Sequence, residues 1–146
     1  MAMRFRAHET FFIRKGWLSK GMKYVSQNPS VFVDAENKAT DVLGIGSNMV
    51  KSLRYWLQVT GLTSEPNNGK RYQSFTDLGK SIFANDRYIE ETGTLCLLQY
   101  KMASNYEGVT AWYYFFNEFN MSEFTKEDFV ASINGFILSK GSSTAV

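Results

Sequence analysis

Polar side chains recur along the stretch VLGIGSNMVKSLRYWLQ, residues 42–58. Lys51 and Arg54 supply positive charge, and the amides of Asn48 and Gln58 can pair with the edge of an adenine. Such side chains on one face of a helix are typical of a helix that enters the major groove of DNA. The candidate DNA contacts on this helix are Ser47, Asn48, Lys51, Ser52, Arg54, Tyr55 and Gln58.

The Gly44-Ile45-Gly46 segment before this helix allows a second interpretation, a glycine-rich phosphate cradle. A dinucleotide fingerprint requires a preceding strand and a third glycine. Here the preceding residues NKATDVL look helical, and Met49 stands at the third glycine position. No Gly-Lys-[Ser/Thr] follows, so the P-loop pattern is also missing. The residues therefore favour a tight turn between two helices.

Other reactive residues are few. The chain has one cysteine, Cys96, and one histidine, His8, which leaves a zinc site of Cys and His ligands incomplete. His8-Glu9 could be an acid/base pair, but the favoured interpretation is a hydrogen-bonding element that ties an N-terminal arm to the body. Cys96 lies in the apolar run TLCLLQY and is expected to be a core thiol. We predict no catalytic residue, no metal and no cofactor.

The elements around the candidate helix support a helix–turn–helix. A helix is expected from Asp34 to Leu43, followed by the turn and a second helix capped by Ser47, for which Asn48 could substitute. The second helix should run to about Thr60, with Gly61 as its C′ glycine. One apolar stripe at helical spacing contains Met49, Val50, Leu53, Trp56 and Leu57.

A hairpin is predicted directly after this helix. Residues 63–75 hold two potential strands around a tip of Pro66, Asn67, Asn68 and Gly69. Lys70 and Arg71 follow the tip and complete the predicted DNA contacts. Helix, turn, helix and hairpin in this order form the winged-helix layout.

The predicted fold class is mainly α with a small β hairpin, a winged helix–turn–helix followed by a helical second half. We divide the chain into an N-terminal arm and helix (1–30), the winged helix (31–85), an acidic, aromatic-rich helical region (86–140) and a disordered tail (141–146). A capping box at 125–128 begins the last helix. The aromatic run 112–116 could stack on bases, but packing in a core or interface is favoured.

Charge is unevenly distributed. Residues 1–80 carry twelve Lys/Arg and six Asp/Glu, whereas residues 81–146 carry four and eight. A basic half that meets an anion is one explanation, and chance in a small protein is the other. Four basic residues at and just before the first helix either extend the basic surface beside the helix–turn–helix or form a solvated helix face, and the sequence does not choose between these. They are Arg14, Lys15, Lys20 and Lys23.

No secretory signal is recognised at the start of the chain, and no run reaches the ~18 apolar residues that span a bilayer. We therefore expect a protein of the cytoplasm that does not enter membranes.

Three segments resemble a known family, the bacterial proteins called DUF4007. They are HETFFIRKGWLSKG, LGIGSNMVKSLRYW and TAWYYFFNEF, within residues 5–138. The resemblance implies a shortened member or a fragment of a longer one. It also implies a genomic neighbourhood of phosphoadenosine-phosphosulfate-reductase-like proteins and of DNA phosphorothioation or other phage-defence components. It carries over no catalytic residues.

Together these features predict a non-catalytic protein that binds double-stranded DNA within a bacterial DNA-modification or anti-phage defence system. The alternative is an adaptor whose winged helix and aromatic half recruit a partner enzyme, such as a reductase-like or nuclease protein. The oligomeric state is left open, and a homodimer is compatible with the sequence.

Overall fold

The computed structural model of the chain describes residues 3–34, 36 and 38–141. The described residues form seven helices and one two-stranded hairpin, so the predicted mainly α class with a small hairpin is confirmed. They divide into two compact units. The larger unit is Arg6–Met102, and the smaller contains residues 3–5 and 103–141.

The larger unit is built on two helices that pack together, α1 (Trp17–Gln27) and α3 (Ser47–Val59). Trp17, Leu18, Met22 and Val25 form the buried side of α1. Four residues of the predicted apolar stripe of α3, Val50, Leu53, Trp56 and Leu57, are buried, whereas the fifth, Met49, is half-buried. This stripe positions the helix and leaves its opposite edge available to solvent.

The helix before the turn is shorter than predicted. Helix α2 spans Ala39–Leu43 and does not begin at Asp34. The side chain of Asp34 accepts hydrogen bonds from Asn28 Nδ2 and from the backbone of Glu36, each at 2.9 Å. Local bonds of this kind compete with helix formation. The prediction followed the apolar positions Ala39, Val42 and Leu43, which give no sign of that competition.

Two glycines set the ends of α2 and α3. Gly44 follows α2 with φ of 64°, in the left-handed region that favours glycine. Gly46, which is extended, is the N-cap of α3, so the prediction that Ser47 caps it is wrong by one residue. Gly61 has φ of 76° just after the C-cap Thr60, and this confirms its predicted role as C′ glycine.

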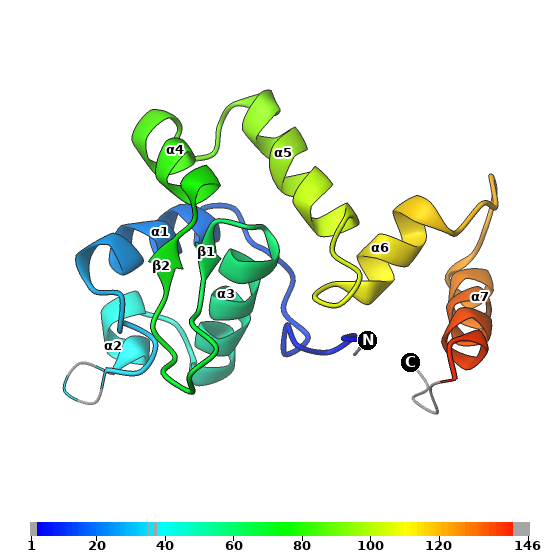
Figure 1. Ribbon diagram of the computed structural model, residues 1–146, viewed down its shortest axis with the longest axis horizontal. Helices are drawn as coiled ribbons and strands as arrows, with labels where there is room; N and C mark the ends of the chain where they lie inside the picture. Colours follow the sequence, from blue (N-terminus) through cyan, green and yellow to red (C-terminus); the bar gives the residue numbers. More distant parts are fainter. Residues whose placement is uncertain (1–2, 35, 37, 142–146) are drawn as a thin grey trace. The chain divides into compact units, whose positions relative to one another are not determined.

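The hairpin follows α3, as predicted. Strand β1 (Thr63–Ser64) pairs antiparallel with β2 (Ser74–Phe75), with Thr63 opposite Phe75. Figure 1 shows both strands beside α3. Helix, turn, helix and hairpin in this order are consistent with a winged helix.

The larger unit also contains α4 (Asp77–Asn85) and nearly all of α5 (Thr92–Ala103). Only Ala103, the last residue of α5, is assigned to the smaller unit. Thr76 caps α4 by accepting a hydrogen bond from Gly79 N at 3.0 Å. Cys96 on α5 is exposed, so the prediction of a core thiol is wrong. The helix turns Leu98 and Met102 inward instead. In the run TLCLLQY apolar residues point to several sides of the helix, so the sequence does not show which side is buried.

The smaller unit contains α6 (Thr110–Asn117) and α7 (Lys126–Ser139). The predicted capping box is present, since Thr125 and Asp128 cap each other's backbone N–H groups. Tyr114 packs with Ile133 and Ile137 in a second core, which agrees with packing for that part of the aromatic run. Phe5 and Met3 join this core, whereas the next residues belong to the other unit. Of the predicted tail, residues 142–146 lie outside the described residues.

Candidate nucleic-acid interface

An exposed ridge runs along one edge of α3. Ser47, Asn48 and Lys51 are exposed at its beginning, and the side chain of Lys51 is 61% exposed. Arg54 and Gln58 continue the same edge and are half-buried. Five of the seven predicted helix contacts therefore share one face, set by the burial of the stripe opposite them.

Arg54 and Gln58 are held by a residue that the sequence analysis did not single out, Glu65. The guanidinium of Arg54 donates two hydrogen bonds to the Glu65 carboxylate, and Gln58 Nε2 donates a third at 3.2 Å. Glu65 follows β1, so this group fastens the hairpin to the ridge. A fork-to-carboxylate pair is among the stronger polar contacts in proteins.

Gln73, the residue before β2, forms hydrogen bonds with both Arg54 and Glu65. It is fully buried, and its Nε2 donates to Arg54 O at 3.1 Å and to Glu65 Oε1 at 3.2 Å. Its Oε1 accepts from Thr63 Oγ1 at 2.9 Å. Buried polar groups need such partners, so Gln73 ties both strands to the helix.

Ionisation of Glu65 is favoured by these contacts. Partial burial raises the pKa of this carboxyl, but the hydrogen bonds from Arg54 and Gln73 and the charges of Arg54 and Arg71 outweigh burial. The net effect is a pKa below the ordinary value.

Stability should therefore fall in acid partly through Glu65. A carboxyl whose pKa is lowered by folding stabilises the folded state above its unfolded pKa, and this contribution is lost as pH falls through the folded pKa. We expect the free energy of unfolding of a Glu65→Gln variant to decrease less than that of the wild type between pH 5 and pH 3. Urea titrations at both pH values measure this. Asp86 and Asp128, whose pKa values are also lowered, are present in both proteins and cancel in the comparison.

Two predicted contacts are not on the ridge. Ser52 is fully buried and Tyr55 is 8% exposed, so their placement on the open polar face is wrong. Ser52 Oγ donates to Phe11 O at 3.1 Å, and the ring of Tyr55 packs edge-on against Trp56 at 5.1 Å. An N-terminal arm, residues 6–13, lies over this side of α3. The sequence of α3 alone does not show that the N-terminal arm covers this side of the helix.

The arm carries His8, which stacks on Trp56 with ring centroids 5.8 Å apart. Trp56 Nε1 donates to Phe11 O at 2.9 Å. His8 therefore helps to tie the arm to the body, as favoured from the sequence, but by stacking. Its buried Nδ1 has no hydrogen-bond partner among the described residues. Two of the segments that resemble the family thus pack against each other.

The hairpin tip supplies the other two predicted contacts, Lys70 and Arg71, and both are exposed. Asn68 Oδ1 accepts from Lys70 N at 3.0 Å, and Gly69 has φ of 76°. This local bond and the left-handed glycine shape the turn that presents both cations. The positive charge of Arg71 contributes to the lowered pKa of Glu65.

Within the described part of the chain, no three His, Cys, Asp or Glu side chains gather as a metal site would require. None of the described helices is long and apolar enough to cross a membrane.

Comparison with known proteins adds a family and two related structures. A magnesium ion-bound SspB crystal structure aligns with a TM-score of 0.78 and 31% identity, and another SspB crystal structure with 0.74 and 32%. Each alignment covers 91% of this chain and 42% of the SspB chain, so the chain spans less than half of their length. No curated protein sequence matches. The model of the family described as "Protein of unknown function (DUF4007)" matches residues 5–146, and the chain belongs to this family.

Proposed function

We propose that the chain is a double-stranded DNA-binding component of a bacterial DNA-modification or anti-phage defence system. The observation that carries this proposal is the exposed ridge of α3 beside a hairpin tip with two exposed cations. In the proposed winged helix, α3 enters the major groove and the hairpin follows the adjacent backbone.

The beginning of α3 is the end that approaches the DNA. Its first turn consists of the uncharged residues Ser47, Asn48 and Met49, and its N-cap is Gly46. No side chain of the described residues caps these first backbone N–H groups, and the positive end of the helix dipole favours a phosphate there. Asn48 can read a base edge, and Lys51 holds a phosphate or a base. Lys51 lies 3.9 Å from Glu9, a surface pair too weak to keep it from DNA.

Arg54 and Gln58 have a different role in this proposal from the one that the sequence suggested. Because both bind Glu65, they set the angle between helix and hairpin and do not reach bases themselves. Ser52 and Tyr55 hold the N-terminal arm, Ser52 through its hydrogen bond to Phe11 O and Tyr55 through its ring, which lies 6.4 Å from that of His8. The contacts proposed with DNA are Ser47, Asn48, Lys51, Lys70 and Arg71.

Salt dependence tests the proposal. Each phosphate neutralised on duplex DNA should contribute about −0.9 to the slope of log affinity against log salt. We expect Lys51→Ala to reduce the steepness of the slope by roughly that amount. Lys126→Ala removes one exposed positive charge from α7 and serves as the matched control, with an unchanged slope. Equal slopes for wild type and Lys51→Ala, measured by fluorescence anisotropy, would contradict groove insertion.

The proposed setting, a DNA-modification or defence system, rests on the genomic neighbourhood that the family resemblance implies. We further propose that this chain binds DNA without cutting or modifying it, since the ridge and tip offer groups that hold and read DNA. Incubation with supercoiled plasmid and magnesium is expected to leave the plasmid intact. Nicking that is retained after rigorous purification would overturn this part of the proposal.

The α5 surface favours the adaptor as a second candidate. Leu97 and Tyr100, three residues apart and therefore on one side of α5, are 49% and 66% exposed. Clustered apolar side chains of this kind often mark protein interfaces. Capture of a reductase-like or nuclease partner that is lost in a Leu97→Ser variant, together with no retardation of duplex DNA at low salt, would support the adaptor over the DNA-binding role.

A further inference from the structure

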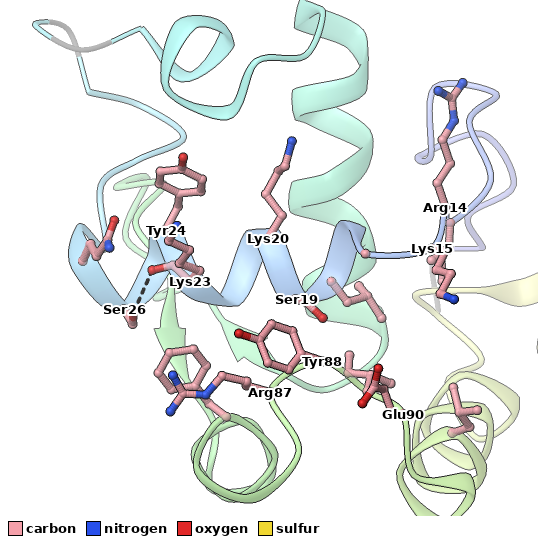
Figure 2. Close-up of a pocket in the computed structure, with 17 residues that line it drawn as sticks. Arg14, Lys15, Ser19, Lys20, Lys23, Tyr24, Ser26, Arg87, Tyr88 and Glu90 are labelled. Atoms are coloured by element: carbon pink, nitrogen blue, oxygen red, sulfur yellow. Dashed lines mark hydrogen bonds between the residues drawn. The ribbon is translucent and has the colours of Figure 1, made fainter.

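A second basic surface lies away from the ridge, in a groove between α1 and residues 83–95. Figure 2 shows Tyr88 beneath α1 beside Ser19, with Arg87 and Glu90 on either side. The groove has a volume of about 1090 Å³ and belongs entirely to the unit Arg6–Met102. It joins four basic residues at and just before α1, whose role the sequence left undecided, to an arginine that lies distant in the chain.

Positive charge dominates this groove. Its lining includes five cations and one acid, Glu90; the cations are Arg14, Lys15, Lys20, Lys23 and Arg87. None of the five forms an ion pair with another described residue. Lys20 donates to Leu43 O at 3.0 Å, and Arg14 lies over the rings of Phe11 and Trp17. Lys23 lies over the ring of Tyr24 at 5.6 Å and Arg87 over that of Phe83 at 5.1 Å. These contacts leave the N–H groups of both side chains open to solvent, so Lys15, Lys23 and Arg87 are exposed and available to an anion.

Aromatic and apolar side chains accompany these cations. Tyr88 is 70% exposed, although it stands inside a groove with an apolar lining. Leu18, Phe83 and Ile89 supply that lining. A flat exposed ring next to cations is the combination that binds a nucleic-acid base and its phosphate together.

The loop that presents Arg87 and Tyr88 is strained. Ile89 has φ of 55°, a left-handed conformation that is a clear outlier for a β-branched residue. The Asp86 carboxylate holds the loop by accepting from Glu90 N at 3.0 Å and from Glu91 N at 3.1 Å. Strain of this kind persists where the surrounding contacts enforce it, and it concentrates at binding sites. Here it fixes two side chains at the edge of the groove.

We propose that this groove binds a single strand of nucleic acid, with phosphates on Lys15, Lys23 and Arg87 and one base stacked on Tyr88. The bases of a duplex already stack on their neighbours and leave no free face for Tyr88, so the ring selects a single strand. This site is separate from the ridge of α3 and uses none of its residues. In this proposal the basic residues at and just before α1 bind nucleic-acid phosphates and are more than a solvated helix face.

Fluorescence anisotropy with a labelled oligothymidylate of about 12 nucleotides, within the usual range of site sizes, tests the proposal. We expect Tyr88→Ala to weaken binding by roughly 5- to 150-fold, the range found when a stacking ring is removed. Tyr88→Phe keeps the ring and should bind like the wild type. The Lys23→Ala/Arg87→Ala double variant should reduce the steepness of the salt slope by about 1.4, or 0.7 for each phosphate on a single strand. Lys126→Ala is the control for lost surface charge.

Several outcomes would overturn the site. Equal affinity of Tyr88→Ala and the wild type for the oligonucleotide would show that no base stacks on Tyr88. Competition by thymidine monophosphate as strong as by the unlabelled oligonucleotide would make the groove a mononucleotide site. If Lys51→Ala weakens single-strand binding as much as Tyr88→Ala does, the strand binds at the ridge of α3 and not only in the groove. Failure of duplex binding alone, with the Tyr88 effect intact, would contradict the proposed function and leave this site standing.

Discussion

Replacement of Gly79 by alanine is expected to destabilise the unit Arg6–Met102 by about 4 kcal/mol or more, at the upper end of single substitutions. A Cβ atom at this position would lie 1.9 Å from the carbonyl oxygen of Leu62. The obstacle is backbone, which cannot rotate away as a side chain does. Thr76 N also donates to Leu62 O at 3.1 Å, so the start of α4 is anchored to the same group. Relief of the clash requires the loss of that anchor.

Gly93 provides the matched control. It lies on α5 in the same unit, and a Cβ atom there would meet nothing within 4 Å among the described residues outside its own helical turn. Gly93→Ala should be neutral or stabilising by about 0.5–1 kcal/mol, because alanine favours the helix. Urea and thermal unfolding of both variants measure the contrast. A Gly79→Ala protein that unfolds like the wild type would show that α4 does not approach Leu62 this closely.

The sequence predicted the elements that depend on local signals. The buried stripe of α3, the left-handed Gly61, the hairpin and the Thr125–Asp128 capping box are each specified by residues a few positions apart. Periodicity and capping report directly on such short-range geometry. For this reason the positions of α3 and the hairpin were correct to within a residue or two.

The candidate site was predicted less completely, because its surroundings come from distant residues. Ser52 and Trp56 are covered by Phe11, which lies 41 and 45 positions away. Nothing in the periodicity of a helix shows which of its sides another segment will cover. The polar character of Ser52 suggested solvent, whereas its hydroxyl is satisfied by a backbone carbonyl.

Glu65 was missed for a similar reason. Its place in the sequence suggests a loop acid, but its carboxylate joins Arg54, Gln58 and Gln73 across the hairpin. The cations at and just before α1 were recognised, yet Arg87 belongs to the acidic half of the sequence and joins them only in the fold. Charge counted along a chain does not describe charge on a surface.

Removal of all three exposed cations of the proposed interface is expected to have the largest functional effect. In a Lys51→Ala/Lys70→Ala/Arg71→Ala variant, three phosphate contacts are lost, and each is worth roughly eightfold in affinity at about 0.1 M salt. Duplex binding should therefore weaken by about 500-fold, and the salt slope should become less steep by about 2.7. All three side chains are exposed, so the melting temperature should remain near that of the wild type.

Removal of a negative charge near the ridge tests the same interface through an expected gain of affinity for duplex DNA. Glu65→Gln removes a negative charge beside the ridge and weakens the hold on Arg54, whose guanidinium then becomes available to a phosphate. Duplex affinity should rise by up to about eightfold at about 0.1 M salt, while the free energy of unfolding falls by about 1–3 kcal/mol. A purely structural role for this group predicts lower stability and no gain in affinity. Higher affinity at lower stability, measured on one protein, therefore separates an interface for DNA from a surface that only holds the hairpin in place.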